Sequence, residues 1–236
     1  FGGAAGPGKT IALAMGALQF VDVPGYSALL LRRTYRQLTQ EGQLMDVMRL
    51  WLRGTEARWD DTEAKWYFPS GATVQMGHLD SERDLENYSG PEYQYIGWDE
   101  LTQFPEAHYR FLFTRLRRRE DLDVPLQMRA ASNPGGIGHE WVRERFITEG
   151  HPDRLYLPAT LKDNPSLDAE EYAQTLENLD PYTRRQMLAG DWDAQPPGEL
   201  FQRDWFEIVD SPPAGLRMVR YWDKAATEPS ETNRDP

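Results

Sequence analysis

The sequence predicts an α/β fold in which a mainly parallel central sheet is flanked by helices. Three observations lead to this prediction. A glycine-rich loop runs into an apolar helix, apolar runs typical of buried strands alternate with helical segments, and an Asp-Glu pair directly follows one of those strands. Strands and helices that alternate after such a loop are typical of a three-layer core, with helices on both faces of the sheet.

The glycine-rich loop covers residues 3–10 and fits the pattern G-x-x-x-x-G-K-[ST] in full. Its backbone N–H groups can converge on phosphate oxygens, and the apolar helix expected over 10–20 points its positive end at them. Lys9 would reach the β- and γ-phosphates, and the Thr10 hydroxyl would ligate Mg²⁺. The expected phosphate-site residues are Gly3, Gly6, Gly8, Lys9 and Thr10. The alternative is a glycine-rich turn that fits the pattern by chance.

Apolar runs and turn residues predict the elements that follow this loop. Strands are expected at 27–32, 66–68, 72–76, 93–98, 125–131 and 154–157, with 66–76 as a β-hairpin. Helices are expected at 35–52, 106–116, 139–147, 169–179 and 182–188, and a polar loop or short helix at 82–87. This alternation supports the α/β prediction.

Two polar pairs follow predicted strands. Asp99 and Glu100 end an apolar strand, where Asp99 would hold Mg²⁺ and Glu100 would orient and polarise an attacking water. A solvated helix N-cap is the alternative. Ser132 and Asn133 follow the strand at 125–131, whose carboxyl end should face the same crevice. There they could hydrogen-bond a γ-phosphate. Alternatively, they could form a turn in which their side chains make only local hydrogen bonds.

The composition limits the other classes of function. The 236 residues carry a net charge of −12 and include no cysteine, which excludes disulfides and cysteine nucleophiles. No apolar run approaches the ~20 residues of a membrane span, so we expect a soluble intracellular protein. The chain starts inside a motif without an initiating Met, so we interpret it as a fragment of a longer protein. The segment 194–215 is rich in Pro and Gly, which predicts a linker before a new domain begins.

In combination, these motifs resemble the large terminase subunit of tailed bacteriophages or prophages, the ATPase that pumps DNA into a procapsid. The motifs that carry the resemblance cover nearly the whole chain and lie at 3–10, 32–35, 96–103, 132–136, 138–141 and 188–192. The resemblance implies a P-loop NTPase core of the ASCE (additional-strand, catalytic-glutamate) or RecA-like type over 1–153, with its first strand missing. It also implies a small helical lid over 154–193 and the truncated start of an RNase H-like nuclease over 216–236.

The resemblance also implies roles for individual residues. Lys9 and Thr10 would be the Walker A residues, Asp99 the Walker B magnesium ligand, Glu100 the catalytic carboxylate, and Ser132 and Asn133 the coupling motif. Asp223 would be the first metal ligand of the nuclease, from which no activity is expected in this chain. Many relatives carry Arg-Gly where this sequence has Ser89-Gly90, and their arginine reaches a neighbouring subunit's ATP. Arg83, Arg32 or Arg33 could replace it here, and the alternative for each is an ordinary surface or salt-bridged arginine.

The implied cofactors are ATP and Mg²⁺. The implied partners are double-stranded DNA, further copies of the chain in a ring, the portal protein and the small terminase subunit, in the cytoplasm of a bacterial host. Two alternatives stay open. The chain could bind nucleotide and assemble without turnover, as a weak module or prophage remnant, or it could be another RecA-like translocase such as a helicase.

Overall fold

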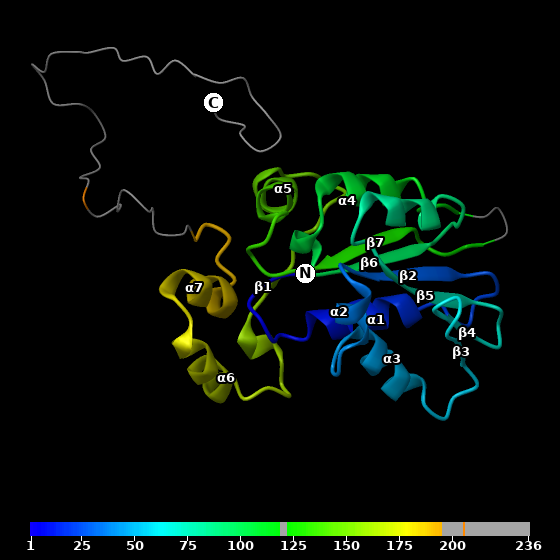
Figure 1. The fold of residues 1–236 in the computed structure, drawn as a ribbon, viewed down its shortest axis with the longest axis horizontal. Helices are drawn as coiled ribbons and strands as arrows, with labels where there is room; N and C mark the ends of the chain where they lie inside the picture. Colours follow the sequence, from blue (N-terminus) through cyan, green and yellow to red (C-terminus); the bar gives the residue numbers. More distant parts are fainter. Residues whose placement is uncertain (119–121, 195–204, 206–236) are drawn as a thin grey trace, which may run out of the picture. The chain divides into compact units, whose positions relative to one another are not determined.

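A six-stranded sheet forms the centre of the fold in the computed structural model, which describes residues 1–118, 122–194 and 205 (Figure 1). Its strand order is β3-β4-β5-β2-β6-β7. The strands are β2 (Ser27–Arg32), β3 (Arg58–Asp60), β4 (Lys65–Tyr67), β5 (Thr73–His78), β6 (Tyr95–Asp99) and β7 (Gln127–Ala131). The last four in this order are mutually parallel, whereas β3, β4 and β5 pair antiparallel. The predicted hairpin is confirmed, and β3 adds to it a strand that the sequence did not predict.

The short strand β1 (Gly2–Gly3) leads into the phosphate loop. It pairs in parallel with β8 (Pro158–Ala159), and Gly2 also forms a parallel bridge to Ser132, directly after β7. The strand before the phosphate loop is therefore separated from β6 by β7. This additional strand between the two is the arrangement expected of the ASCE type, so the predicted fold class is confirmed.

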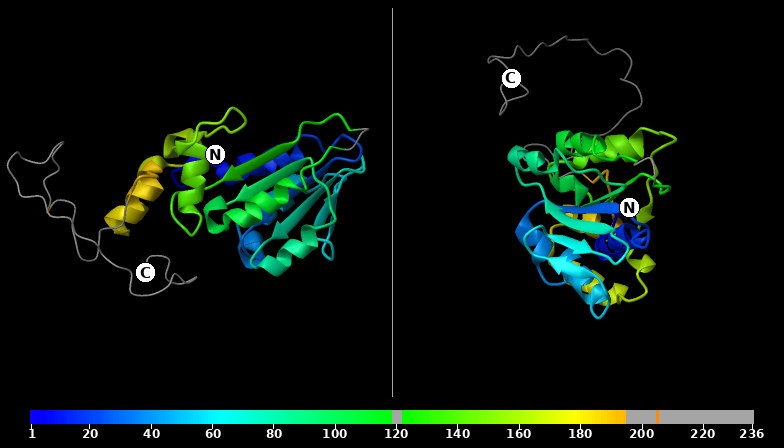
Figure 2. Two further views of the ribbon diagram at one scale, coloured as in Figure 1. Left: turned by 90° about the horizontal axis from the view of Figure 1, so that it is seen from above. Right: turned by 90° about the vertical axis from the view of Figure 1, so that its right-hand side faces the viewer.

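Helices cover both faces of the sheet (Figures 1 and 2). They are α1 (Lys9–Leu18), α2 (Tyr35–Thr39), α3 (Leu44–Leu52), α4 (Glu106–Phe113), α5 (His139–Arg143), α6 (Ala169–Thr175) and α7 (Pro181–Ala189). The first three lie on one face, and α4 and α5 on the other. Leu30 packs into the core of the α1 face, whereas Leu29 and Leu31 pack into the opposite core. Burial on both faces explains why β2 is a continuous apolar run.

Two predicted elements were wrong. The helix expected over 35–52 is divided into α2 and α3, because Gly42 adopts a φ of 73° and the chain turns between them. Trp51, near the end of α3, is 37% exposed. The strand expected at 154–157 does not form, and the adjacent pairing segment is β8. Leu155 there is 76% exposed, so its apolar side chain marks no buried strand.

The helices expected over 106–116, 139–147, 169–179 and 182–188 form, with small differences at their ends. Helix α4 ends at Phe113, and α5 continues as a π-helix at Glu144–Thr148. Short 3₁₀ helices cover Glu82–Tyr88, Leu101–Gln103, Leu161–Asp163 and Leu176–Asn178. The lid segment, by which we mean residues 154–193, contains β8, α6 and α7 and lies beside β1 (Figure 1).

The linker expected at 194–215 lies outside the described residues except at its first position and at position 205, and the expected domain start at 216–236, with Asp223, lies outside them entirely. Within the part of the chain that the structure describes, no helix is long and apolar enough to cross a membrane.

Candidate nucleotide site

The carboxyl ends of three parallel strands meet the amino end of α1. Arg32 ends β2, Asp99 ends β6, and Ser132 and Asn133 follow β7, while Lys9 is the first residue of α1. Gly8 caps this helix with a φ of 84°, a left-handed conformation that glycine adopts without steric cost. The structure therefore brings the predicted phosphate-loop residues and both predicted polar pairs together at one edge of the sheet.

Lys9 is buried, with 8% of its surface exposed. Its ammonium donates a hydrogen bond to Asn133 Oδ1 at 2.5 Å and another to the Ala4 carbonyl. Burial lowers the pKa of Lys9 to about 8, although Glu100 and Asp99 nearby favour the charged form. The contact with Asn133 joins the phosphate loop to the segment after β7, so the lysine already touches the residue expected to report on the γ-phosphate.

This lowered pKa predicts that nucleotide affinity depends on pH. Below pH 8 Lys9 is charged and ready to bind phosphate, whereas above pH 8 binding must be accompanied by proton uptake. We expect the Kd for metal-free ADP to rise roughly tenfold per pH unit above pH 8. Titrations between pH 7.5 and pH 9.5 would measure this, and Lys9→Arg, whose guanidinium stays protonated, should remove the dependence. A Kd that stays flat in the wild type would contradict the prediction.

Asp99 is fully buried and contacts two polar side chains. Thr10 Oγ1 donates to Asp99 Oδ1 at 2.9 Å, and the Arg32 guanidinium forms an ion pair with Asp99 Oδ2. Among the described residues no group of three or more His, Cys, Asp and Glu side chains could hold a metal ion. A hydroxyl beside one carboxylate fits Mg²⁺, which binds through one or two carboxylates together with phosphate oxygens and water.

The Arg32–Asp99 ion pair is expected to contribute to stability, because the side chains are only 12% and 1% exposed. Arg32→Ala would leave a buried carboxylate without its counter-charge, so we expect the free energy of unfolding to fall by about 3 kcal/mol. Urea denaturation without nucleotide or Mg²⁺ would measure this. The double variant Arg32→Ala/Asp99→Asn should be more stable than Arg32→Ala alone, and equal or lower stability would contradict this explanation.

Glu100 occupies a strained backbone position. It has a φ of 57°, and only one other non-glycine residue among those described, Ala64, has a positive φ. Burial and the neighbouring Asp99 raise the pKa of Glu100, and the nearby Asn133 backbone N–H partly offsets this rise. Strained residues with raised pKa values concentrate at functional sites, and a carboxylate of raised basicity is suited to accept a proton from water.

Ser132 and Asn133 have different environments. The Ser132 hydroxyl is buried and lies 2.8 Å from the hydroxyl of Thr102, whose backbone N–H also donates to it at 3.1 Å. Asn133 instead contacts Lys9 and Glu100. Thr102 received no role in the sequence analysis, although it lies within the motif at 96–103, three residues after Asp99.

The three candidate trans-acting arginines also differ. Arg32 is paired with Asp99 of its own chain, and Arg33 forms an ion pair with Asp80 at 3.5 Å. Arg83 is exposed, at the start of the 3₁₀ helix that covers Glu82–Tyr88. Of the three, Arg83 is the exposed one, whereas the Arg33 side chain is 23% exposed and the Arg32 side chain 12%.

Three hydrogen bonds join the lid segment to backbone groups of the phosphate loop. The Ala4 N–H donates to the Ala159 carbonyl at 2.9 Å, and the Ala5 N–H donates to the Met187 carbonyl at 2.7 Å. Asn164 Nδ2 donates to the Gly6 carbonyl at 2.7 Å. The shape of the phosphate loop therefore depends on residues more than 150 positions later in the chain.

Solved structures of phage terminases resemble this fold. The large terminase from a thermophilic bacteriophage aligns with a TM-score of 0.67 and 18% identity, over 90% of this chain and 53% of that one. The complex of the same phage terminase with ADP aligns with a TM-score of 0.61 and 18% identity, over 81% and 47%. The HK97 bacteriophage large terminase aligns with a TM-score of 0.55 and 14% identity, over 81% and 46%. The chain thus spans about half the length of these proteins.

The sequence itself provides a second comparison. The family described as "Terminase large subunit, T4likevirus-type, N-terminal" matches residues 1–208, which is most of the chain. No curated protein sequence matches at a significant level. The match to the family model, in the fold of the solved terminases, shows that this chain belongs to the large terminase subunit family and covers its N-terminal region.

Proposed function

We propose that this chain is the ATPase motor domain of a terminase large subunit, which hydrolyses ATP to drive double-stranded DNA into a procapsid. The observation that carries the proposal is the convergence of Lys9, Thr10, Asp99 and Glu100 at the amino end of α1. The large terminase from the thermophilic bacteriophage has been solved with ADP and with ATP-γ-S, which supports nucleotide binding by this chain.

In the proposed mechanism, the backbone N–H groups at the start of α1 and the Lys9 ammonium bind the β- and γ-phosphates. Thr10 and Asp99 would hold Mg²⁺, which supplies positive charge against the phosphate oxygens. Glu100 orients the attacking water and accepts its proton, because burial raises the basicity of this carboxylate. Asn133 contacts both Lys9 and Glu100, so it is placed to respond when the γ-phosphate leaves.

The proposed partners are double-stranded DNA, the portal protein, the small terminase subunit and further copies of the chain in a ring inside the bacterial host. Arg83 is our candidate for the arginine that reaches a neighbouring subunit's ATP. Its exposure supports this role, whereas Arg32 and Arg33 pair with carboxylates of their own chain.

Phosphate release at varied Mg²⁺ concentration, with and without double-stranded DNA, tests the proposed function. We expect release that requires Mg²⁺ and increases with DNA. Thr10→Ala removes one proposed magnesium ligand, so it should raise the Mg²⁺ concentration for half-maximal release about tenfold. Thr39→Ala should leave that concentration unchanged, because the Thr39 hydroxyl bonds backbone carbonyls of its own helix, α2. ATP binding without release would contradict the motor and favour a nucleotide-binding assembly module.

A further inference from the structure

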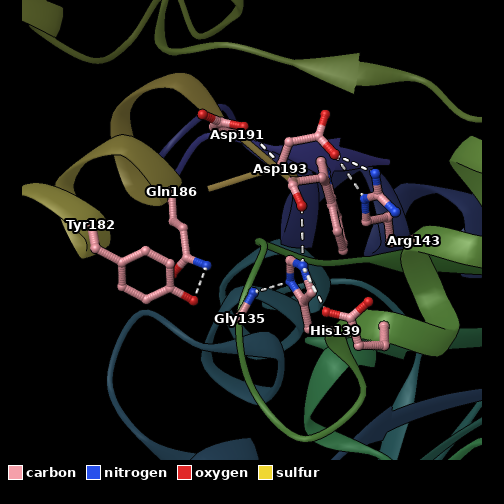
Figure 3. Close-up of polar contacts among 9 residues, drawn as sticks. Gly135, His139, Arg143, Tyr182, Gln186, Asp191 and Asp193 are labelled. Atoms are coloured by element: carbon pink, nitrogen blue, oxygen red, sulfur yellow. Dashed lines mark hydrogen bonds and ion pairs between the residues drawn. The ribbon is translucent and has the colours of Figure 1, made fainter. Parts of the chain in front are cut away.

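His139 lies between two segments that are distant in the sequence (Figure 3). Its Nδ1 accepts a hydrogen bond from the Gly135 backbone N–H at 2.8 Å, and its Nε2 lies 3.1 Å from the Trp192 carbonyl oxygen. Because Nδ1 accepts, the ring proton is on Nε2, which donates to Trp192. The imidazole also stacks on the Trp192 indole, with ring centroids 5.4 Å apart. Both ring nitrogens of one neutral tautomer are therefore used.

The hydrogen bond from Gly135 connects His139 to the nucleotide site. Gly135 is two residues after Asn133, which accepts a hydrogen bond from Lys9 and lies near Glu100. The same loop is held at its far end by the Gly138 N–H, which donates to the Thr102 carbonyl at 2.7 Å. His139 thus fixes the middle of a loop that contacts Lys9 at one end and Thr102 at the other.

The other side leads to the lid segment. Trp192 follows α7, and its indole N–H donates to the Tyr156 hydroxyl at 2.9 Å. The next residue, Asp193, accepts a hydrogen bond from Arg143 Nε of α5 at 2.9 Å, as Figure 3 shows. Gln186 of α7 is buried beside Gly135, where it bonds the Tyr182 hydroxyl at 2.8 Å. The end of the lid segment therefore packs on α5 and on the loop after β7.

We propose that His139 is a positioning residue that couples the placement of Asn133 to the placement of residues 187–193 of the lid segment. A displacement of the Asn133 loop changes the Gly135 hydrogen bond, and the imidazole transmits that change to Trp192. This inference rests on the proposed function, because it supplies the physical connection by which phosphate loss at Lys9 would move the lid segment.

The test measures amide hydrogen exchange of residues 187–193 without nucleotide, so it does not depend on ATP hydrolysis. Asn133→Ala releases the loop from Lys9, and we expect exchange in 187–193 to increase about fivefold. In a His139→Gln background the Gly135 hydrogen bond is already lost, so adding Asn133→Ala should produce no further increase. An undiminished increase in that background would overturn the proposal. It would place the coupling in the phosphate loop, through the contact of Ala5 with Met187.

The variants His139→Asn and His139→Gln test the hydrogen bond to Gly135 and the hydrogen bond to Trp192 separately. The Asn side chain in His139→Asn can replace Nδ1 as acceptor, and the Gln side chain in His139→Gln can replace Nε2 as donor. We expect Asn to preserve protection at Gly135 while exposing 190–193, and Gln to do the reverse, with thermal stability near that of the wild type. Equal exchange in both variants and the wild type would contradict the proposal.

ADP binding to the wild type distinguishes a failure of this inference from a failure of the proposed function. Absence of ADP binding would refute the nucleotide site while the exchange measurements still decide the coupling. ADP binding that changes exchange in 187–193 of the wild type, and not of either His139 variant, would support both.

Discussion

Glu100→Gln is expected to lower kcat for ATP hydrolysis at least about 100-fold, which is the usual contribution of a general base. The amide cannot accept a proton from water, although it has nearly the same size and shape as the carboxylate. Nucleotide affinity should change by less than about threefold, because phosphate binding depends on Lys9 and the loop backbone. Steady-state phosphate release and binding of a fluorescent nucleotide would measure the two effects separately.

Glu86→Gln provides the matched control, since Glu86 is exposed on the 3₁₀ helix over Glu82–Tyr88 and contacts no candidate site residue in the described contacts. Turnover of this variant should equal that of the wild type. If Glu100→Gln kept wild-type turnover, the assignment of Glu100 as the base would be wrong and another group would have to orient the water.

Gly190→Ala is expected to disrupt the phosphate loop from a distant position in the sequence. Gly190 ends α7 with a φ of 62°, and a Cβ there would overlap Gly3 Cα and lie 2.5 Å from Ala4 N. These are backbone atoms, so the loop itself must move, and Ala4 also provides the carbonyl that binds Lys9. We expect the free energy of unfolding to fall by about 3 kcal/mol and the Kd for ADP to rise at least roughly tenfold.

Gly54→Ala is the control that measures the cost of placing alanine in a left-handed backbone conformation without any contact to the phosphate loop. Gly54 has a φ of 78°, and a Cβ there would meet no atom within 4 Å. This variant should lose only the stability that a left-handed alanine costs, about 1 kcal/mol, with unchanged ADP affinity. Equal effects of the two substitutions, measured by urea denaturation and ADP titration, would show that contact with the phosphate loop contributes nothing.

The local patterns in the sequence predict the centre of the fold well. Residues 27–32 are largely apolar because β2 is buried on both faces, and the glycine loop predicts the start of α1 to within one residue. Asp99 could be singled out because an Asp-Glu pair follows an apolar strand downstream of a complete phosphate-loop pattern. The break between α2 and α3 could not be predicted, because the apolar spacing over 35–52 continues through the turn and Gly42 is its one signal.

The features that the sequence does not predict are contacts between segments that are distant in the chain. No sequence spacing connects Arg32 to Asp99, and their pairing depends on β2 and β6 being neighbours in the sheet. The same is true of Thr102 with Ser132 and of His139 with Trp192. Motif spacing identifies which residues carry chemistry, but side-chain partners that are far apart in the chain depend on the sheet order and the packing around it.

The most direct test of the central claim is steady-state phosphate release from Mg-ATP by this chain and by Lys9→Ala. We predict release by the wild type and loss of that release in the variant, because the ammonium that binds the phosphates is gone. Equal release by both proteins, or none by a folded wild type that binds ATP, would contradict the assignment of this site as an ATPase.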